Sequence, residues 1–506
     1  MLARILKLPF LVVLMGLAGA SMLLPAVHAS VTGDHFVARS FGYSALLFLI
    51  LTTLVAIATD NQKPDNLGRN HLLTMFVAFI ALPAMLALPF NIAVGDTTFL
   101  NSYVEMVSAM TTTGATLFDD PARLPASVHF WRAFVGWMGG FLVLVTAVAI
   151  LAPLNLGGFE VMAPLNNRRK SAGQSNVVWT ADGAHRLQRF SARLFPIYAG
   201  LTFVLWVILL LLGDVPLVAV SHAMSVLATS GISPVGGLQN SSAGIGGEVV
   251  VFAFLFFALS RQTFMSDKSD GSIAQLKSDP EFKIAIFCMI VVPSLLFARH
   301  WLGAYEVEEV ADVGGAMAAL WGGIFTVLSF LSTTGFESSA WGAAREWSGL
   351  ASPAIILMGM ALVGGGVATT AGGVKLLRVY ALYKHGVREM DRLVHPSSVG
   401  GAGSSARRLR RQGAYVAWVF FMLFALSLGF VTLGLSLTGL DFQSAMIHTV
   451  AALSTTGPIV SVAGADVVAM SALSEPAKLI LAGAMVLGRL EMLAIIALLN
   501  PDFWRA

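Results

Sequence analysis

Four short strings of threonine or serine followed by glycine recur along the chain, and they constrain its fold more than any other feature. They are Thr112-Thr113-Gly114, Thr229-Ser230-Gly231, Thr333-Thr334-Gly335 and Thr455-Thr456-Gly457. The glycines lie 117, 104 and 122 residues apart, a period too long for a solenoid repeat. Each string follows a short amphipathic run and precedes a longer apolar segment. The pattern predicts one structural unit used four times.

The composition predicts the environment of these units. Of the 506 residues, 56% are hydrophobic and 12% are charged, and the mean hydropathy is +0.78. The charged share is about half that of a soluble domain, so we predict an all-α polytopic membrane protein. The single cysteine, Cys288, excludes an intrachain disulfide, and the net charge of +3 does not suggest nucleic acid as a partner.

Within each unit, the order is a full span, a short helix, the string and a second span. A bilayer needs about 20 apolar residues to be crossed, and the short helices fall below that length. The four units use His71–Phe90, Ser102–Met110 and Trp131–Leu151; Leu194–Leu212, Ala219–Ala228 and Val249–Ser260; Ile284–Phe297, Ala318–Leu331 and Pro353–Val374; and Tyr415–Leu437, Phe442–Leu453 and Ala477–Leu498.

Two further apolar segments, Ile5–Ala29 and Arg39–Ala58, precede the first unit. The small residues Ala26–Ala29 resemble a signal-peptidase site, but the length of the segment favours a retained span. We therefore predict two N-terminal helices followed by four repeats around a pseudo-fourfold ion pathway. The expected boundaries are 1–60 for the hairpin and 61–160, 161–270, 271–395 and 396–506 for pore repeats one to four.

The distribution of Lys and Arg predicts the orientation, because basic residues collect in short cytoplasmic loops. With the N-terminus inside, 24 of the 31 Lys and Arg residues lie on the cytoplasmic side. The short helices then enter from outside. Their partially negative C-terminal ends would converge at the centre of the membrane and attract a cation.

The strings themselves have the chemistry of an alkali-cation filter. Glycine permits a positive φ, so that successive carbonyls can point inward and replace the hydration shell of an ion, and Thr or Ser hydroxyls add further oxygens. The alternative is that these small residues only permit close helix packing. Four strings at the same place in four repeats favour the pore.

These motifs resemble the Trk/Ktr/HKT superfamily of potassium transporters, and within it the TrkH family. The resemblance rests on Thr111–Thr116, Gly364–Lys375 and Gly488-Arg489-Leu490-Glu491, and it covers almost the whole chain. It implies K⁺ uptake across a bacterial inner membrane, a homodimer, and gating by a cytoplasmic nucleotide-binding subunit of the TrkA type. In this superfamily a serine in place of the first filter glycine accompanies Na⁺ permeation, so glycine in all four strings favours K⁺. The coupling ion, H⁺ or Na⁺, stays open.

The stretch Gly364–Gly373 holds five glycines, Gly364, Gly365, Gly366, Gly372 and Gly373. Each glycine costs a helix about 1 kcal/mol against alanine, so we expect the helix to break here. The functional interpretation is a gating loop that obstructs the pathway, and the alternative is packing glycines. Because no Ser or Thr follows Lys375, the stretch is not a phosphate loop, and we predict no nucleotide site on this chain.

Several polar residues in apolar surroundings allow two interpretations. Arg489 either pairs with a carboxylate or carbonyls of another helix, or forms a cationic barrier to K⁺ below the filter. Glu105, His222 and His448 lie nine residues before a string glycine and are expected to make structural hydrogen bonds. For Glu105 the alternative is a negative potential near the mouth of the pathway. These three residues would carry the activity only in the alternative of a membrane enzyme or receptor. The basic cluster Arg407–Arg411 is expected to be a cytoplasmic anchor at the foot of a span, and contact with lipid headgroups or with the regulatory partner is the alternative.

Overall fold

The computed structural model of the chain describes residues 9–59, 67–153, 156–161, 183–260, 279–304, 313–348, 354–395, 411–464 and 467–490. Within these ranges the regular structure is helical and no strand occurs. Eight helical segments among the described residues are long and apolar enough to cross a membrane. The predicted all-α polytopic membrane fold is confirmed.

The N-terminal hairpin consists of α2 (Phe10–Ser21), α3 (Leu23–Val31) and α4 (His35–Thr59). The helices α2 and α3 form one segment of 22 residues that is long enough to span a bilayer, and both pack against α4. The two predicted N-terminal helices are therefore present. The residues before Pro9 that belong to the first predicted span lie outside the described part of the chain.

The four repeats follow the hairpin in the predicted order, and each contains a long first helix, a helix that ends at the string and a further helix after it. Repeat one contains α5 (Leu67–Val94), α6 (Phe99–Met110) and α7 (Ala126–Thr146), which continues as a π-helical turn (Ala147–Leu151); repeat two contains α9 (Gly183–Leu211), α10 (Pro216–Ala228) and α11 (Gly244–Leu255); repeat three contains α14 (Pro280–Ala304), α15 (Val313–Leu331), α16 (Trp341–Ser348), α17 (Ala354–Val363) and α18 (Leu376–Val394); repeat four contains α19 (Arg411–Leu437), α20 (Phe442–Leu453), α21 (Ile459–Val462) and α22 (Glu475–Leu490). Within the described residues, of the helices after the strings only α7 with its continuation is long and apolar enough to cross a membrane, and α15, which precedes the third string, is also long and apolar enough.

Local sequence explains where the short helices begin. Thr98 caps α6 by accepting a hydrogen bond from the amide of Asn101, and Asp441 caps α20 by accepting one from the amide of Ser444. Pro216 occupies the first turn of α10, where its missing N–H would have had no partner. Both α6 and α20 contain 12 residues and are about 18 Å long. They are too short to cross the roughly 30 Å hydrocarbon core of a bilayer.

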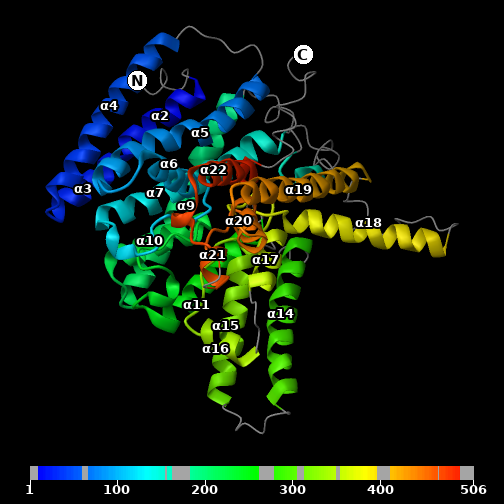
Figure 1. Cartoon of the computed structure of the whole chain (residues 1–506). Helices are drawn as coiled ribbons and strands as arrows, with labels where there is room; N and C mark the ends of the chain where they lie inside the picture. Colours follow the sequence, from blue (N-terminus) through cyan, green and yellow to red (C-terminus); the bar gives the residue numbers. More distant parts are fainter. Residues whose placement is uncertain are drawn as a thin grey trace.

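The repeats close into a ring through one recurring contact. The second span of each repeat packs against the short helix of the next repeat, so that α7 lies on α10, α11 on α15, α17 on α20, and α22 on α6. Because the last of these contacts returns to the first repeat, the arrangement is pseudo-fourfold. Figure 1 shows the hairpin α2–α4 along one side of this body and α18 extending away from it.

Two segments of repeat three differ from the expected boundaries. The short helix, expected at Ala318–Leu331, begins at Val313 and has 19 residues, because the preceding Val-Gly-Gly-Ala-Met continues its apolar character. The second span ends at Val363, and the non-helical residues 364–375 separate α17 from α18. This break agrees with the cost of several glycines in one helix. In repeat four, residues 491–498 of the last predicted span lie outside the described residues.

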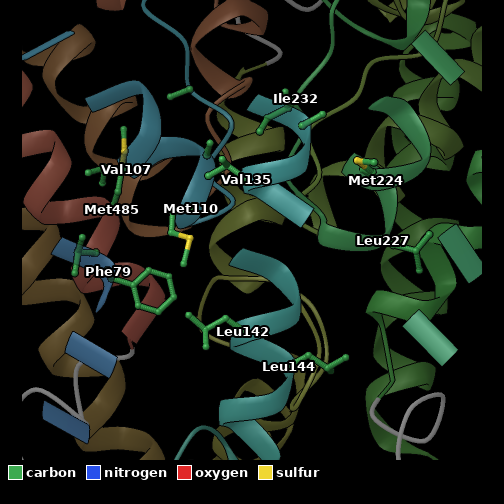
Figure 2. Packing of buried hydrophobic residues seen from close by; sticks show 14 of the residues in the cluster. Phe79, Val107, Met110, Val135, Leu142, Leu144, Met224, Leu227, Ile232 and Met485 are labelled. Carbon is green, nitrogen blue, oxygen red and sulfur yellow. The ribbon is translucent and has the colours of Figure 1, made fainter. Parts of the chain in front are cut away.

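The core fixes the end of the first short helix. Val107 and Met110 of α6, Val135 of α7 and Met485 of α22 are each at most 4% exposed, and Figure 2 shows their side chains in one packed cluster. Small residues let the second spans approach the short helices closely. A Cβ on Gly139 would overlap the carbonyl oxygen of Met110.

Gly488 occupies the equivalent position in repeat four, and its substitution tests this close approach. A Cβ at Gly488 would overlap the carbonyl oxygen of Leu453, whereas a Cβ at Gly483 on the same helix meets open space. We expect Gly488→Ala to destabilise the protein by about 1–3 kcal/mol through overpacking. Gly483→Ala should be neutral or slightly stabilising. Thermal unfolding of both purified variants in detergent measures the difference, and equal unfolding temperatures would contradict the packing described here.

Candidate functional site

The fold brings the four predicted strings together at one place. A Cβ added to each string glycine would overlap an atom of another string or of the residue that directly follows it, which shows how closely the backbones approach. The pairs are Gly114 with the carbonyl of Ser230, Gly231 with the carbonyl of Thr334, Gly335 with the ring of Pro458, and Gly457 with the amide of Ala115. The contacts run from repeat one to two, three and four and back to one, so the strings form a closed ring.

Each string begins with a threonine in the left-handed region of backbone conformation. The φ values are +54° at Thr112, +51° at Thr229, +60° at Thr333 and +55° at Thr455. This conformation costs a non-glycine residue about 1–3 kcal/mol. The sequence predicted positive φ only for the glycines, because local propensity does not reveal strain that tertiary contacts hold in place.

A repeated hydrogen bond holds the strained turns. The residue between the threonine and the glycine donates its amide proton to a carbonyl five residues earlier in the short helix. The four bonds are Thr113 to Ser108 at 2.8 Å, Ser230 to Ser225 at 2.9 Å, Thr334 to Ser329 at 2.9 Å, and Thr456 to Ala451 at 2.8 Å. They supply partners for backbone groups that the helix end would otherwise leave unpaired.

The fourth string differs from the other three. Gly114, Gly231 and Gly335 have φ values of +70°, +65° and +83°, whereas Gly457 does not have a positive φ. Pro458 follows it, and a proline restricts the preceding residue to extended conformations. The amide of Gly457 donates instead to the carbonyl of Thr113 at 2.6 Å. The four strings are therefore not equivalent.

The site offers oxygen atoms from neutral groups. The hydroxyls of Thr112 and Thr455 are buried and have no hydrogen-bond partner among the described residues, although buried polar atoms are normally paired. Within the described ranges no group of three or more His, Cys, Asp or Glu gathers that could hold a metal. Backbone carbonyls and hydroxyls at the C-terminal ends of α6, α10, α15 and α20 suit a weakly hydrated monovalent cation.

The predicted structural role of three polar residues agrees with their contacts. Glu105 accepts the amide proton of Leu117 at 2.9 Å and pairs with Arg132 at 2.6 Å. The Nε2 atom of His448 lies 2.8 Å from the carbonyl oxygen of Val468. Each of these two side chains thus holds the segment that leaves its string.

His222 plays the corresponding part in repeat two. Its Nε2 atom lies 2.8 Å from the hydroxyl of Ser233, and its Nδ1 atom lies 3.8 Å from the carboxylate of Asp214. Burial acts to raise the pKa of Asp214, but the nearby imidazole of His222 and the hydrogen bond from the Ser241 hydroxyl outweigh it and hold that pKa below its usual value. Asp214 is therefore an anion near neutral pH and orients the imidazole.

The glycine-rich loop, residues 364–375, lies at the end of the ring where the strings begin. The amide of Gly372 donates to the Thr333 hydroxyl at 2.8 Å, and a Cβ on Gly372 would overlap atoms of Ser454 and Thr455. The Thr370 hydroxyl donates to the carbonyl of Leu227 at 3.1 Å. The loop therefore contacts the second, third and fourth short helices or their strings.

Two further contacts anchor the loop away from the strings. The amide of Val367 donates to Glu281 of α14 at 2.8 Å, and the amide of Gly366 donates to the carbonyl of Ala258 at 3.0 Å. Gly364 and Gly373 have positive φ, as does Lys375 at +83°. Lys375 is buried, and its ammonium group donates to the carbonyl of Ala371. Of the predicted gating residues in this loop, Gly372 lies against the strings and the others lie against the loop itself or neighbouring helices.

Arg489 is 7% exposed and follows Gly488, whose backbone lies against the carbonyl of Leu453. Its backbone is thus close to the start of the fourth string. Glu491 lies outside the described residues.

Sequence reasoning missed Arg132, Glu248, Glu281 and Pro458 as neighbours of the site. The position of Glu248, a charged residue at the border of an apolar span, was the sequence feature that could have indicated a role near the site.

Comparisons with known proteins identify relatives along almost the whole chain. The family model described as "TrkH: Cation transport protein" matches residues 40–237 and 283–503. The Trk system potassium uptake protein TrkH of Vibrio parahaemolyticus is 28% identical over 97% of this chain and 98% of that protein. The corresponding protein of Escherichia coli K12 is 27% identical over 97% of both chains. The crystal structure of the potassium transporter TrkH from V. parahaemolyticus matches with a TM-score of 0.81 at 27% identity and covers 100% of both chains.

The Glu105–Arg132 pair generates a stability prediction. Both side chains are at most 6% exposed, so Arg132→Met would leave a buried carboxylate without its cation and should cost about 3–5 kcal/mol. Adding Glu105→Gln should recover much of that loss, because the glutamine oxygen can still accept the Leu117 amide proton. Unfolding of the single and double variants in detergent measures both effects. A single variant as stable as the parent would show that the pair contributes nothing.

Proposed function

The chain belongs to the TrkH family of cation transport proteins, and from this premise we propose that it takes up potassium through a filter formed by its four strings. The relatives are named as potassium uptake proteins, and none of those named here is an enzyme. The observation that carries the proposal is the closed ring of strings, with two buried hydroxyls that have no hydrogen-bond partner in the described part of the chain.

The filter has a simple physical basis. K⁺ loses its water on entering, and the carbonyl and hydroxyl oxygens of residues 112–114, 229–231, 333–335 and 455–457 replace it. The negative ends of four helix dipoles lower the energy of the ion without a side-chain carboxylate. Glycine in all four strings favours K⁺ over Na⁺. Na⁺ permeation through the same pathway is the second candidate function.

The loop 364–375 is proposed as the gate. Two sets of contacts support a position of the loop that obstructs the pathway next to the filter. Gly372 of the loop contacts Thr333 and Ser454, and Thr370 of the loop contacts Leu227. Arg489, near the start of the fourth string, is proposed to add a cationic barrier there. A cytoplasmic nucleotide-binding subunit of the TrkA type would then move the loop by displacing α18, because α18 begins directly after the loop.

The proposed setting is a bacterial inner membrane, crossed several times, with the N-terminus in the cytoplasm. The Lys and Arg distribution supports this orientation. A homodimer would cover part of the apolar surface of α18, where Tyr383, Met390 and Leu393 are 63%, 59% and 82% exposed. The basic cluster 407–411 is proposed to contact lipids or the regulatory subunit, and its side chains lie outside the described residues.

The filter assignment predicts the effect of side chains at the string glycines. Gly114→Asp and Gly335→Asp should each abolish K⁺ uptake without preventing membrane insertion, because a Cβ at either position would collide with a neighbouring string. The matched control is Gly342→Asp in repeat three, where a Cβ meets open space. Uptake of K⁺ by liposomes that contain purified protein provides the measurement. Normal K⁺-selective uptake in both filter variants would remove the filter assignment.

The gate assignment predicts a leak. A variant shortened within Gly366–Ala371 should show faster K⁺ flux and weaker dependence on the regulatory subunit, because the obstruction is smaller. Combining the shortened loop with Gly335→Asp should abolish that flux again if the leak passes through the filter. Flux per monodisperse protein, with and without the subunit, distinguishes the outcomes. Unchanged, fully subunit-dependent flux would assign the glycines to packing alone.

A further inference from the structure

The segments that leave the strings are held differently in the four repeats. In repeats one, two and four, the side chain nine positions before the string glycine makes a hydrogen bond to the segment after the string. The pairs are Glu105 with Leu117, His222 with Ser233, and His448 with Val468. The equivalent residue in repeat three is Thr326. Its hydroxyl lies 3.4 Å from the amide nitrogen of Ser338, which is the longest of these contacts and beyond the usual range of an N–H···O bond.

Glu248 supplies the missing hold from the neighbouring repeat. This residue lies on α11 of repeat two, 90 residues before Ser338. One carboxylate oxygen accepts the amide proton of Ser339 at 2.6 Å. The other accepts the Ser338 hydroxyl at 2.6 Å and the Trp321 indole N–H of α15 at 2.9 Å. The carboxylate thus joins the third short helix to the segment that begins three residues after Gly335.

The charge of Glu248 is not neutralised as that of Glu105 is. Glu248 is 1% exposed, and no Lys, Arg or His among the described residues forms an ion pair with it. Three uncharged donors satisfy its oxygens. A buried carboxylate held in this way is strongly tied to its donors, because the low dielectric of the interior strengthens each hydrogen bond.

We propose that Glu248 is a positioning residue that fixes the third filter string and thereby helps the filter to discriminate K⁺ from Na⁺. The inference rests on the proposed filter. Discrimination requires carbonyl oxygens that do not contract freely around a smaller ion, so the segment after Gly335 must be held. Without the carboxylate, the Ser339 and Trp321 N–H groups lose their acceptor and the segment moves to find others.

The test is Glu248→Gln, which keeps the size of the side chain but replaces one acceptor oxygen by an NH₂ donor. Either the Ser339 amide or the Trp321 indole then faces another donor. We expect the K⁺/Na⁺ permeability ratio of reconstituted protein to fall by about tenfold, the equivalent of one lost hydrogen bond to a charged group. The control is Asp34→Asn in the N-terminal hairpin, where the carboxylate accepts the Val37 amide proton far along the chain from any string.

A rescue variant separates positioning from a general effect on folding. Glu248→Ala should lower the ratio further, and adding Thr326→Glu should restore part of it, because the new carboxylate occupies the position that Glu105 holds in repeat one. If Glu248 were purely structural, its substitution would change the yield of folded protein, and the K⁺/Na⁺ permeability ratio measured on the folded fraction would stay unchanged. If Glu248→Gln does not fold, Ser338→Ala removes a single donor and should lower the ratio by a smaller factor.

The outcomes distinguish this inference from the proposed function. Parent protein that conducts no K⁺ would overturn the proposed function itself. K⁺ flux in the parent with an unchanged K⁺/Na⁺ ratio in folded Glu248→Gln and Ser338→Ala would overturn only the role of Glu248. A lower ratio in these variants, with the Asp34→Asn ratio unchanged, supports the role.

Discussion

The need to pair backbone polar groups inside an apolar protein governs this structure. A short helix that ends within such a body leaves carbonyl and N–H groups exposed where water is scarce. The chain solves this problem four times with the same turn, in which a left-handed threonine is followed by an amide that bonds back to the helix. Of the string hydroxyls, those of Thr112 and Thr455 are buried without a hydrogen-bond partner among the described residues. In the proposed filter, stability and ion binding would therefore draw on the same segments.

The repeats share backbone geometry but differ in the side chains that hold it. Repeat one uses a buried ion pair, repeats two and four use histidines, and repeat three uses a carboxylate from its neighbour. Pro458 adds a further difference, because it changes the conformation of the fourth string glycine. One polypeptide can vary four positions independently, which four identical subunits cannot do. The ring is thus fourfold in its backbone and asymmetric in its chemistry.

The glycine-rich loop links three repeats at the point where their strings begin. It is held in part through its backbone, by the amide of Gly372 at Thr333 and the amide of Val367 at Glu281. Position 372 requires glycine because a Cβ there would collide with Ser454 and Thr455. The apolar side chains of the loop are buried as well: Val367, Ala368, Ala371 and Val374 are each at most 4% exposed, so moving the loop would expose apolar surface.

The amino-acid sequence alone determined the helical membrane fold, the four units, the short helices and the break after Val363. These features depend on apolar length, glycine content and spacing, which are local properties. The tertiary structure decided the left-handed threonines, the exceptional Gly457 and the carboxylate that Glu248 provides to a segment 90 residues away. Such features depend on which hydrogen-bond donors and acceptors from distant parts of the chain come into contact when the ring closes, and local sequence patterns do not predict those contacts.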